Sequence, residues 1–528
     1  MGNKKIDFVC DILVVGGGVN GAGIAREAAG RGLSVVLCEK DDLASHTSSA
    51  STKLIHGGLR YLEFYEFGLV RKALIEREVL LRSAPHIMWP LRFVMPHEKG
   101  LRPAWMIRAG MLLYDSLARR VLLPGSRGVD LRKHAAGRPL DPRFQRGFIY
   151  SDGWVDDARL VVLNAIDAAE KGAQILTRTA CMSLAHEPGG WLAQLQRDDG
   201  STLAVQARCV VNASGPWAVR FLQEAAHHPA ERNLRLIKGS HIVVKRLFDH
   251  AHAYIFQHPD GRIVFAIPYE HDYTLIGTTD IDYRGDPNQV AIDQAEIEYL
   301  CKLASHYFIK PIEPGDVVWS YSGVRPLVED DASKASAVTR DYRFELDGEG
   351  APMLTIFGGK ITTFRKLAEE ALDLLAPLLG NSAGHWSADA CLPGGDLFGP
   401  KPQNRSVLQF DQYVLGLQKE FAWLPAALVA RYARAYGSRI RVLLAGRSAL
   451  HEMGEEIAPG FFAAEAAYLM QHEWAGTAQD MLWRRSKLGL HLPPDTAAKL
   501  DAWIDAWINT QMQASGHAAR DKATGNDR

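Results

Sequence analysis

Hydrophobic and polar positions between residues 6 and 43 predict a strand, a glycine-rich turn, a helix and a second strand. The apolar run "DILVV" is followed by "GGGVNGAGIAREAAGRG" and then by "LSVVLCE". Short apolar runs that flank a glycine-rich turn and a helix are typical of a βαβ unit, because its strands are buried on both faces. We therefore expect two parallel strands joined by a helix over this segment.

The pattern of the remaining chain predicts three further regions. The segment "DDARLVVLNAIDAAEKGA" predicts an amphipathic helix with acidic residues in its first turn, and strand-like runs follow it up to "CVVNASG". Between 236 and 346, runs such as "SHIVVKR" and "YTLIGTTDID" predict a mixed, largely antiparallel sheet. The segment "LTIFGGKITTFRKLAEEAL" predicts a strand, a glycine turn and a helix, and after "CLPGGDLFGPKPQNR" the pattern is helical.

Composition limits the classes of function. The chain has 528 residues, a formal net charge of -1, 47% hydrophobic and 23% charged residues. These values are typical of a soluble protein of about two to four domains with no general attraction for nucleic acid. The six scattered cysteines form no CxxC pair, so we expect neither a zinc site nor a dithiol site, and no metal. Neither a signal peptide nor a run of about 18 apolar residues is evident, which favours a cytoplasmic protein that does not span a membrane.

Three glycines of the first turn have the spacing of a dinucleotide-binding motif. Gly16, Gly18 and Gly21 form G-x-G-x-x-G directly after a strand and at the start of a helix. This arrangement lets the backbone approach a pyrophosphate and directs the positive end of the helix dipole at it. Glu39 ends the second strand, where a carboxylate accepts hydrogen bonds from ribose hydroxyls and disfavours the 2'-phosphate of NADP. The motif alone leaves NAD and FAD open.

The rest of the chain favours FAD, because nicotinamide domains usually repeat the βαβ unit and this chain has a single one with a second glycine-rich passage far downstream. Together with "SSASTKLIHGGLRYLE", "YSDGWVDDARL", "NASGPW", "IKGSHIVV", "IGTTDIDY", "WSYSGVRPL" and "FGGKITTFRKLAE", the first motif resembles the FAD-dependent glycerol-3-phosphate dehydrogenase family of the aerobic, respiratory type. The resemblance covers residues 10–395, and the helical region resembles the family's cap domain more loosely. One departure is Ser214, where the family more often has threonine, and the hydroxyl is kept.

The resemblance implies an α/β (α+β) fold with a Rossmann-like FAD-binding domain of the glutathione-reductase or DAO type, a mixed β-sheet substrate domain and a C-terminal helical cap domain. We expect the FAD-binding domain at 6–235 and 350–390, the substrate domain at 236–349 and the helical domain at 400–512. The polar segment 513–528 is expected to be disordered. The implied reaction oxidises sn-glycerol 3-phosphate at C2 to dihydroxyacetone phosphate, with hydride transfer to flavin N5.

Cationic residues carry the implied substrate chemistry, since a phosphate group and a reduced flavin both need positive charge. The resemblance places Arg60, Arg325, Arg340 and Lys360 in the substrate site, together with Tyr61. Arg325 and Lys360 are also expected to be catalytic. For each arginine taken alone, a surface ion pair is the alternative. The motif context favours the site for Arg60, Arg325 and Lys360, and less so for Arg340.

His241 in "KGSHIVV" is the candidate base that takes the C2 hydroxyl proton, since an imidazole accepts protons near neutral pH. A core histidine bonded to the backbone is the alternative. Arg325 or an ordered water remains a competing acceptor of the proton. His56 is expected to line the flavin through its backbone rather than bind it covalently, so we expect non-covalent FAD.

The FAD contacts are expected on the first glycine turn, the loop "SHTSSASTK" with its continuation, the "NASGPW" turn and "FGGKIT". The loop hydroxyls, including those of Ser49 and Thr52, are candidate donors to the phosphates and the ribityl chain, and a solvated loop is the alternative. The expected cofactor-binding residues are Gly16, Gly17, Gly18, Asn20, Gly21, Ala22, Glu39, Lys40, Thr47, Ser48, Ser51, Lys53, Leu54, His56, Gly57, Gly58, Ala213, Gly215, Trp217, Gly359, Lys360, Ile361 and Thr362.

Residues 99–133 concentrate positive charge around apolar positions. The segment has eight basic and two acidic residues, a net charge of +6, which suits a helix lying in a membrane interface. A core helix with a basic end is the alternative. The resemblance favours peripheral attachment to the inner face of the cytoplasmic membrane with ubiquinone as electron acceptor, and a homodimer is one candidate assembly. The apolar and aromatic side chains of this helix are Trp105, Met106, Ile107, Met111, Leu112, Leu113 and Tyr114.

Other functions remain open on the same residues. A related scaffold could serve a glycerol-3-phosphate oxidase that uses oxygen, or an amine or amino-acid oxidase, whose substrate has little need of several phosphate-directed cations. A flavin-binding, membrane-docking regulatory protein is the non-enzymatic alternative. That alternative leaves Arg60, Arg325 and Lys360 unexplained in their motifs.

Overall fold

The computed structural model describes residues 5–98, 102–230, 232–257, 262–328, 341–348 and 350–524. The chain divides into two compact units, Met1–Tyr413 and Val414–Arg528. The boundary lies inside helix α9 (Phe410–Glu420), after the proline- and glycine-rich segment. Among the helices of the described ranges, none combines the length and the hydropathy that crossing a bilayer requires.

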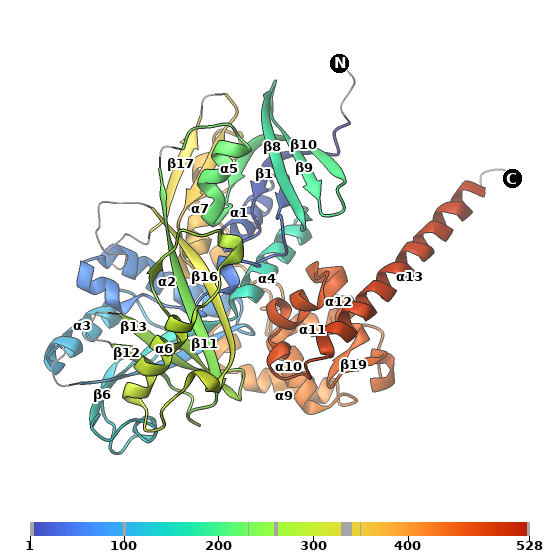
Figure 1. The fold of residues 1–528 in the computed structure, drawn as a ribbon. Helices are drawn as coiled ribbons and strands as arrows, with labels where there is room; N and C mark the ends of the chain where they lie inside the picture. Colours follow the sequence, from blue (N-terminus) through green and yellow to red (C-terminus); the bar gives the residue numbers. More distant parts are fainter. Residues whose placement is uncertain are drawn as a thin grey trace. The chain divides into compact units, whose positions relative to one another are not determined.

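The expected βαβ unit lies at the centre of an eight-stranded sheet in the first unit (Figure 1). Strand β1 (Phe8–Val15) pairs in parallel with β2 (Val35–Cys38), and helix α1 (Val19–Gly30) connects them. Strand β10 (Thr202–Asn212) pairs in parallel with β1 on its other side, so the carboxyl ends of these strands meet at one edge. The other strands of this sheet are β7 (Gln174–Leu176), β8 (Thr179–Glu187), β9 (Gly190–Arg197), β17 (Arg343–Asp347) and β18 (Met353–Phe357).

Helix α1 packs against two further helices, α4 (Asp157–Glu170) and α7 (Phe364–Leu375). It consists largely of small residues, and a Cβ added at Gly23 would lie 2.8 Å from the Phe364 ring. Elsewhere on the sheet, Trp191 of β9 and Phe221 of helix α5 (Ala218–Glu224) join Leu13 of β1 in one buried cluster. The eight-stranded sheet is therefore buried by helices and by its own antiparallel strands.

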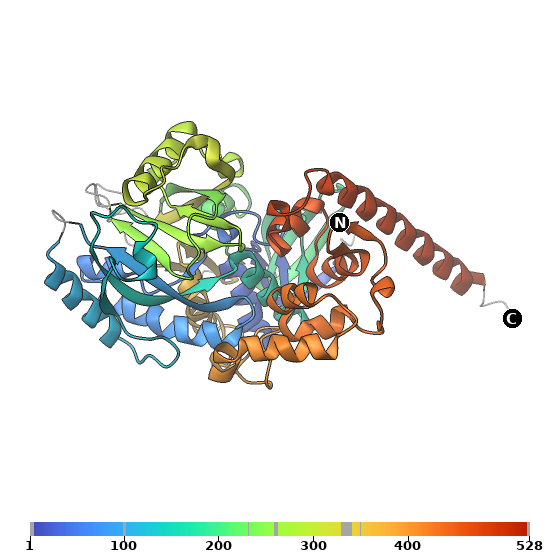
Figure 2. The ribbon, with the colours of Figure 1, turned by 90° about the horizontal axis from the view of Figure 1, so that it is seen from below.

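A ten-stranded mixed sheet is the second layer of the first unit. Its longest pairing joins β11 (Leu234–Lys245) to β16 (Val317–Val328) in antiparallel register. Helix α6 (Gln294–Tyr307) lies over the strands (Figure 2, yellow-green) and packs Leu300 and Tyr307 against Ile242. The other strands are β3 (Leu54–Ile55), β4 (Met88–Pro96), β5 (Arg127–Asp130), β6 (Arg146–Val155), β12 (Ala253–Gln257), β13 (Ile263–Tyr269), β14 (Tyr273–Gly277) and β15 (Ile281–Asp282).

The sheets do not follow the domain boundaries that the sequence pattern predicts. Strands β3 to β6, from residues 54–155, belong to the ten-stranded sheet, although 6–235 is predicted as FAD-binding domain. Strand β17 lies in the eight-stranded sheet, although 236–349 is predicted as substrate domain. The reason is pairing between distant segments, since β4 lies beside β12 with Phe93 opposite Ala253. A hydrophobic pattern predicts that a strand forms but not which strand it joins.

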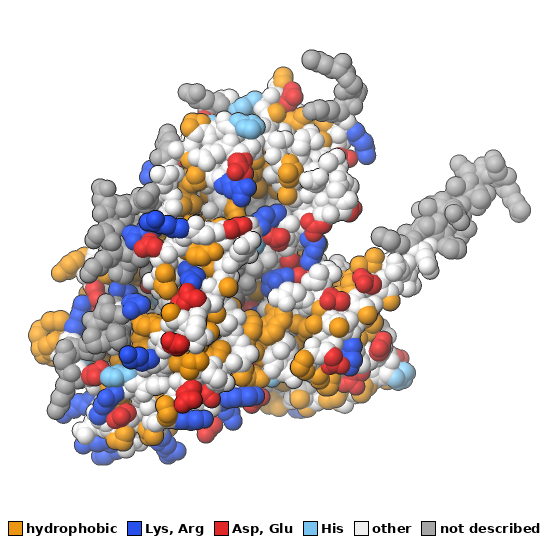
Figure 3. Space-filling model, viewed as in Figure 1, with side chains coloured by type: hydrophobic (Ala, Val, Ile, Leu, Met, Phe, Trp, Pro, Cys, Tyr) orange, Lys and Arg blue, Asp and Glu red, His pale blue; other side chains and the backbone are white. Residues whose placement is uncertain are grey.

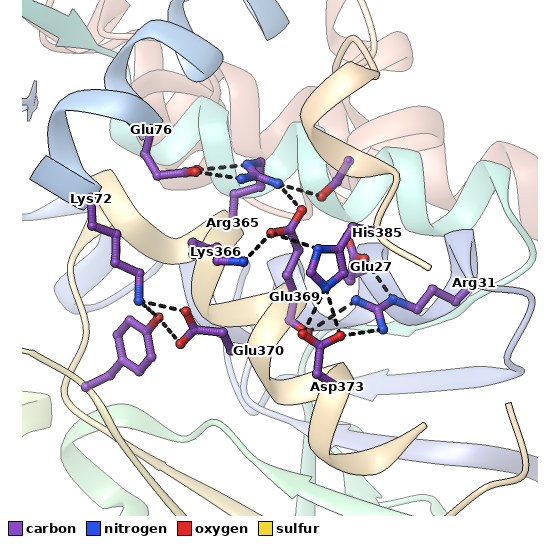
Figure 4. A network of polar contacts seen from close by, with 12 residues as sticks. Glu27, Arg31, Lys72, Glu76, Arg365, Lys366, Glu369, Glu370, Asp373 and His385 are labelled. Carbon is purple, nitrogen blue, oxygen red and sulfur yellow. Dashed lines mark hydrogen bonds and ion pairs between the residues drawn. The ribbon is translucent and has the colours of Figure 1, made fainter. Parts of the chain in front are cut away.

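A buried ionic network fastens α1, α2 (Phe67–Ser83) and α7 to one another (Figure 4). Arg365 of α7 donates to both carboxylate oxygens of Glu76 on α2, at 2.8 and 2.6 Å, and also pairs with Glu369. Arg31 at the end of α1 contacts Asp373 of α7 at 3.0 Å. Since α7 begins directly after residues 361–363, these ion pairs also fix the position of the second glycine turn.

The second unit is mainly helical. Inside it, Arg431 donates to both carboxylate oxygens of the fully buried Glu465, at 2.7 Å each. The last helix, α13, runs over Thr496–Thr524, so the structure has helix over much of 513–528, where the polar composition predicts disorder. Alanine, arginine and lysine in "HAARDKAT" are good helix formers, which accounts for the difference. The other elements are α10 (Ala426–Tyr436), α11 (Ile440–Leu443), β19 (Glu456–Ala458), β20 (Phe461–Phe462), α12 (Ala463–Glu473) and a π-helical turn (Asp480–Arg485).

Candidate active site

A cavity of about 630 Å³ in the first unit is lined by residues of both sheets. Its volume lies in the ~300–1,000 Å³ range of ligand and cofactor sites. The wall includes the carboxyl ends of β1 and β2, the loop after β2 and the turn after β10. It continues along β13 and β16 to the second glycine turn at 358–362. The cavity therefore joins the predicted dinucleotide motif to the predicted substrate residues.

The first glycine turn is shaped by close backbone contacts. Gly16 has a φ of 111°, and an added Cβ would lie 2.6 Å from the Ala213 carbonyl oxygen. A Cβ at Gly21 would lie 1.9 Å from the Gly16 carbonyl oxygen. Only glycine fits at these two positions, because one needs a left-handed backbone and both lack room for a side chain. The turn and α1 therefore pack as the motif predicts.

The N-terminus of α1 faces the cavity, and its N-cap residue contributes no side-chain cap. Gly18 occupies the N-cap position and lines the cavity with Val19 and Asn20. The Val19 amide donates to the Ser48 hydroxyl at 3.0 Å. Free amide groups and the positive end of the helix dipole make such a terminus a site for phosphate groups.

Glu39 lies at the end of β2, is 8% exposed and lines the cavity. One of its carboxylate oxygens accepts from the Gly17 amide at 2.6 Å, and the other accepts from the Asp41 amide at 2.9 Å. Burial raises the pKa of Glu39, and these two amide bonds oppose that rise. The carboxylate is thus held rigidly at the place where the motif predicts a ribose.

Two buried polar atoms of the cavity wall test whether these residues fit FAD. Within the described ranges, Trp217 Nε1 and Asn20 Oδ1 have no hydrogen-bond partner, and both residues line the cavity. A buried polar group without a partner costs ~1–3 kcal/mol, which a hydrogen-bonding ligand recovers. These atoms, the uncapped N-terminus of α1 and Glu39 therefore fit FAD. The helix terminus would hold its pyrophosphate and Glu39 its ribose.

Most residues expected to bind the cofactor do line the cavity. Lys53 does not, because it is buried in an ion pair with Asp157 at 2.6 Å. Gly57 does not line the cavity either, and its amide donates to the Tyr114 hydroxyl at 2.9 Å. Outside the wall are also Gly17, Gly21, Ala22 and Gly58. The residues in the wall are Gly16, Gly18, Asn20, Glu39, Lys40, Thr47, Ser48, Ser51, Leu54, His56, Ala213, Gly215, Trp217, Gly359, Lys360, Ile361 and Thr362.

Two of the expected cationic residues, Arg325 and Lys360, line the cavity, and Tyr61 does so as well. Arg325 donates to Asp280 at 2.5 Å and to the Thr278 hydroxyl at 3.0 Å. The Lys360 ammonium lies 3.9 Å from the centre of the Tyr61 ring. The cavity wall therefore carries two cationic side chains held by their neighbours, Arg325 by Asp280 and Thr278 and Lys360 by the Tyr61 ring.

The other two expected arginines are not in this group. Arg60 is not among the residues that line the cavity, and its guanidinium lies 5.9 Å from the centre of the Phe64 ring. It belongs to a 3-10 helix (Leu59–Phe64) and is next in sequence to Tyr61, which does line the cavity. Arg340 lies outside the described residues.

His241 of β11 is fully buried and does not line the cavity. Its ring stacks on Tyr321 with the ring centres 4.7 Å apart, and its Nε2 lies 2.9 Å from the Thr52 hydroxyl. Burial lowers the pKa of His241 well below its ordinary value, and the positive charges of Arg325 and Lys53 lower it further. The imidazole is therefore neutral at pH 7, as a proton acceptor must be.

Several wall residues were not among the expected ones. Phe265 of β13 lies in the wall, with its ring centre 6.5 Å from that of His56. Thr278 and Asn288 also line the cavity, and Asn288 accepts a hydrogen bond from Lys40 at 2.7 Å. Alternation along "RIVFAIPYE" predicts which face Phe265 takes, but not that this face meets the cavity. The pairing of β13 with β14 and β12 decides that.

Two family models match separate segments of the sequence. Residues 11–365 match the family described as FAD dependent oxidoreductase. Residues 387–508 match the C-terminal domain of alpha-glycerophosphate oxidase. The first match covers more than half of the chain and includes the glycine turn, His241 and Arg325.

Curated relatives and a solved structure agree with this assignment. A glycerol-3-phosphate dehydrogenase of Pseudomonas aeruginosa is 52% identical over 94% of this chain and 95% of its own length. A D-erythritol 1-phosphate dehydrogenase of Brucella abortus is 50% identical over 94% of this chain and 98% of its own length. The crystal structure of the glycerol-3-phosphate dehydrogenase from Bacillus halodurans complexed with FAD is 26% identical, with a TM-score of 0.76 over 97% of this chain and 92% of that one. The chain is an FAD-dependent oxidoreductase and belongs to the glycerol-3-phosphate dehydrogenase family.

Proposed function

We propose that this enzyme oxidises sn-glycerol 3-phosphate to dihydroxyacetone phosphate. The observation that carries the proposal is the pair of cations, Arg325 and Lys360, in the wall of the same cavity as the dinucleotide motif. A guanidinium and an ammonium group recognise a phosphate, whereas an amino acid would need a single cation for its carboxylate. The relatives named glycerol-3-phosphate dehydrogenase support the same substrate.

In the proposed mechanism, Arg325 binds the substrate phosphate. Its contacts with Asp280 and Thr278 hold the guanidinium against the wall before the substrate arrives, so little side-chain freedom is lost on binding. Lys360, held over the Tyr61 ring, places positive charge where negative charge develops during the reaction. His241 takes the proton of the C2 hydroxyl, because burial keeps it neutral. FAD, when bound, supplies the hydride acceptor.

A second candidate substrate is a four-carbon polyol phosphate. The Brucella abortus relative, named D-erythritol 1-phosphate dehydrogenase, is nearly as similar in sequence as the Pseudomonas aeruginosa relative. Both substrates carry a phosphate and a secondary alcohol, so the same cations and the same base would serve either one. They differ by one carbon, and the size of the cavity next to Phe265 would discriminate between them.

Anaerobic addition of glycerol 3-phosphate to the purified holoenzyme tests this function directly. We expect the flavin absorbance to bleach at micromolar to millimolar substrate, with a lower second-order rate constant for erythritol 1-phosphate. N-methylglycine is the matched control for an amine oxidase and should leave the flavin oxidised. Bleaching by N-methylglycine alone would contradict the proposal. If none of these substrates reduces the flavin, the non-catalytic alternative is favoured. Rapid peroxide formation in air, undiminished by a quinone, would favour an oxidase.

We further propose that a membrane quinone reoxidises the flavin and that helix α3 (Ala104–Ser116) attaches the protein to the cytoplasmic face of the inner membrane. Trp105 is 70% exposed and Leu112 is 52% exposed, and Figure 3 shows hydrophobic side chains over this region at the left edge. The helix packs against the 3-10 helix that carries Tyr61. Exposed aromatic and aliphatic side chains flanked by arginines suit an anionic bilayer surface.

The structure divides the expected interface residues into two groups. Met111 and Tyr114 are 1% and 2% exposed, so they pack inward and do not belong to the membrane face. Arg108 donates to the Ser126 hydroxyl at 2.7 Å, and Arg120 pairs with Asp115 at 2.7 Å. Charge reversal at either arginine would therefore remove one of these contacts as well as change the surface charge. Lys99 lies outside the described residues.

The double variant Trp105→Ser and Leu112→Ser should bind vesicles of phosphatidylglycerol and phosphatidylethanolamine about 10-fold more weakly than the wild type at low salt. Losing one to two kcal/mol of interfacial burial, about the value of one large apolar side chain, has this effect. Co-sedimentation measures the partition coefficient. Ile309→Ser, at a residue that is 60% exposed elsewhere on the first unit, is the matched control. Equal sedimentation of the double variant and wild type would exclude α3 as the attachment site.

A further inference from the structure

The His241 ring is enclosed by the two strands that flank β11, namely β14 and β16. Tyr321 of β16 stacks on one face of the ring with an interplanar angle of 15°. A Cβ added at Gly277 of β14 would lie 2.1 Å from the imidazole Cδ2, so β14 also closes on the ring. The histidine has 0% exposure and is absent from the cavity wall. A base must come within about 3.2 Å of the proton it takes, or act through an intermediate group.

Thr52 is the residue that joins the imidazole to the cavity. Its hydroxyl lies 2.9 Å from His241 Nε2, and the residue itself lines the cavity wall. A hydroxyl both donates and accepts, so it can give its proton to a nitrogen while taking another from a ligand. The position of Thr52 thus matches that of an intermediate group between a substrate hydroxyl and the buried ring.

We propose that Thr52 is a catalytic residue, which passes the proton of the substrate's C2 hydroxyl to His241. This proposal rests on the proposed function and deepens it. The C2–H bond breaks, and its electron pair leaves with the hydrogen as hydride to the bound FAD. The C2 O–H bond breaks, and its proton binds the Thr52 oxygen. The original hydroxyl proton of Thr52 binds His241 Nε2, so the products are the ketone, the reduced cofactor, a neutral threonine and an imidazolium.

The backbone around Thr52 is held by buried polar contacts. Asp157 accepts from the Ser51 hydroxyl at 2.7 Å and from the Lys53 ammonium at 2.6 Å. The Tyr321 hydroxyl donates to the Ser51 carbonyl at 2.8 Å. The residues on both sides of Thr52 are therefore anchored, and the ring that stacks on His241 is anchored to the same segment. Such support from neighbouring groups keeps a proton path within hydrogen-bond distance.

The charges near His241 link this path to substrate binding. Without substrate, burial, Arg325 and Lys53 all lower the pKa of the imidazole. Asp280 already pairs with Arg325 at 2.5 Å. The negative charge of a phosphate bound at Arg325 would add to that of this carboxylate and raise the pKa of the imidazole, so the imidazole becomes a better proton acceptor when the substrate is in place. Asp157 already pairs with Lys53 in the absence of substrate. The proton path would thus work best in the substrate complex.

The test compares Thr52→Val with Thr52→Ser, His241→Gln and the double variant Thr52→Val with His241→Gln, all purified as holoenzymes. Valine keeps the shape of threonine and removes the hydroxyl, whereas serine keeps the hydroxyl. Thr355→Val, at a buried threonine of β18 outside the cavity wall, is the control for loss of a threonine hydroxyl. The measurements are FAD content, kcat and KM for glycerol 3-phosphate from pH 5 to 9, and the imidazole nitrogen spectrum of protein labelled with 15N-histidine.

We expect Thr52→Val to keep its FAD and to lower kcat about 100-fold, the lower range for loss of general-base catalysis, with KM changed less than about threefold. Thr52→Ser should recover most of the rate. The double variant should be no slower than His241→Gln, because both residues serve one path. The Nε2 signal that disappears in His241→Gln should shift in Thr52→Val but not in Thr355→Val.

Any other result contradicts either the proton relay through Thr52 or the proposed function. A Thr52→Val enzyme with wild-type kcat, a double variant whose effects multiply, or a serine variant as slow as the valine variant overturns the relay. Loss of FAD in Thr52→Val also overturns it and makes Thr52 a cofactor ligand. These results leave the proposed function intact if wild type is reduced by glycerol 3-phosphate. Failure of the wild type to be reduced overturns the proposed function, and the relay with it.

Discussion

Replacing His241 by glutamine is expected to lower kcat at least 100-fold while FAD remains bound. Glutamine retains a polar group next to Thr52 but cannot accept a proton at neutral pH. His241 is absent from the cavity wall, so the change should leave the contacts that hold the cofactor and the phosphate in place. KM should therefore change little, which is the pattern for loss of an interaction made only during the chemical step.

The pH dependence of kcat gives an independent test of the same substitution. The pKa of His241 lies well below its ordinary value because of burial and the charges of Arg325 and Lys53, so the wild-type rate should fall only at a pH well below the ordinary imidazole value of about 6.5. In His241→Gln this fall in rate at low pH should disappear. Stopped-flow reduction of the flavin by glycerol 3-phosphate measures both effects. His250→Gln, at a histidine of the same sheet region that contacts Tyr254 outside the cavity, is the control. A rate within threefold of wild type would remove His241 from the mechanism and favour Arg325 or water.

Replacing Glu76 by alanine is expected to destabilise the first unit by ~3–5 kcal/mol, because it leaves Arg365 buried without its main partner. Glu76 is 3% exposed and accepts from Nε and Nη2 of Arg365, at 2.8 and 2.6 Å, while the third nitrogen, Nη1, pairs with Glu369 (Figure 4). Arg365 itself is 5% exposed, so water cannot replace the lost carboxylate without opening the contact between α2 and α7. Urea denaturation followed by tryptophan fluorescence measures the shift in midpoint.

The same substitution should weaken FAD binding, since α7 starts at the end of the second glycine turn. Lys360, Ile361 and Thr362 of this turn line the cavity, and a shift of α7 would move them. Asp249→Ala removes an exposed ion pair with Arg246, whose side chains are 92% and 51% exposed, and should cost less than about 1 kcal/mol. Equal midpoints for both variants would show that the buried network contributes no more to stability than a surface pair.

The glycine motif and its cofactor were predictable from the sequence because their chemistry is local. Gly16, Gly18 and Gly21 follow one strand within six residues, and the spacing alone specifies a turn without side chains at the start of a helix. The structure confirms the turn, and comparison with the FAD-dependent family confirms the cofactor. Arg325 and Lys360 were expected from the family resemblance of their motifs, and both line the cavity, one from strand β16 and the other from the second glycine turn.

The sequence by itself thus determined the elements, the dinucleotide motif and the residue types that recognise a phosphate, because each depends on a few neighbouring residues. Only the tertiary structure decided that residues 54–155 contribute strands to the ten-stranded sheet and that Arg60 does not line the cavity. It also decided that His241 is buried behind Thr52. These features depend on contacts between segments far apart in the sequence, such as β4 and β12, or Thr52 and His241. No local pattern encodes such contacts, because pairing and burial are set by the packing of the whole unit.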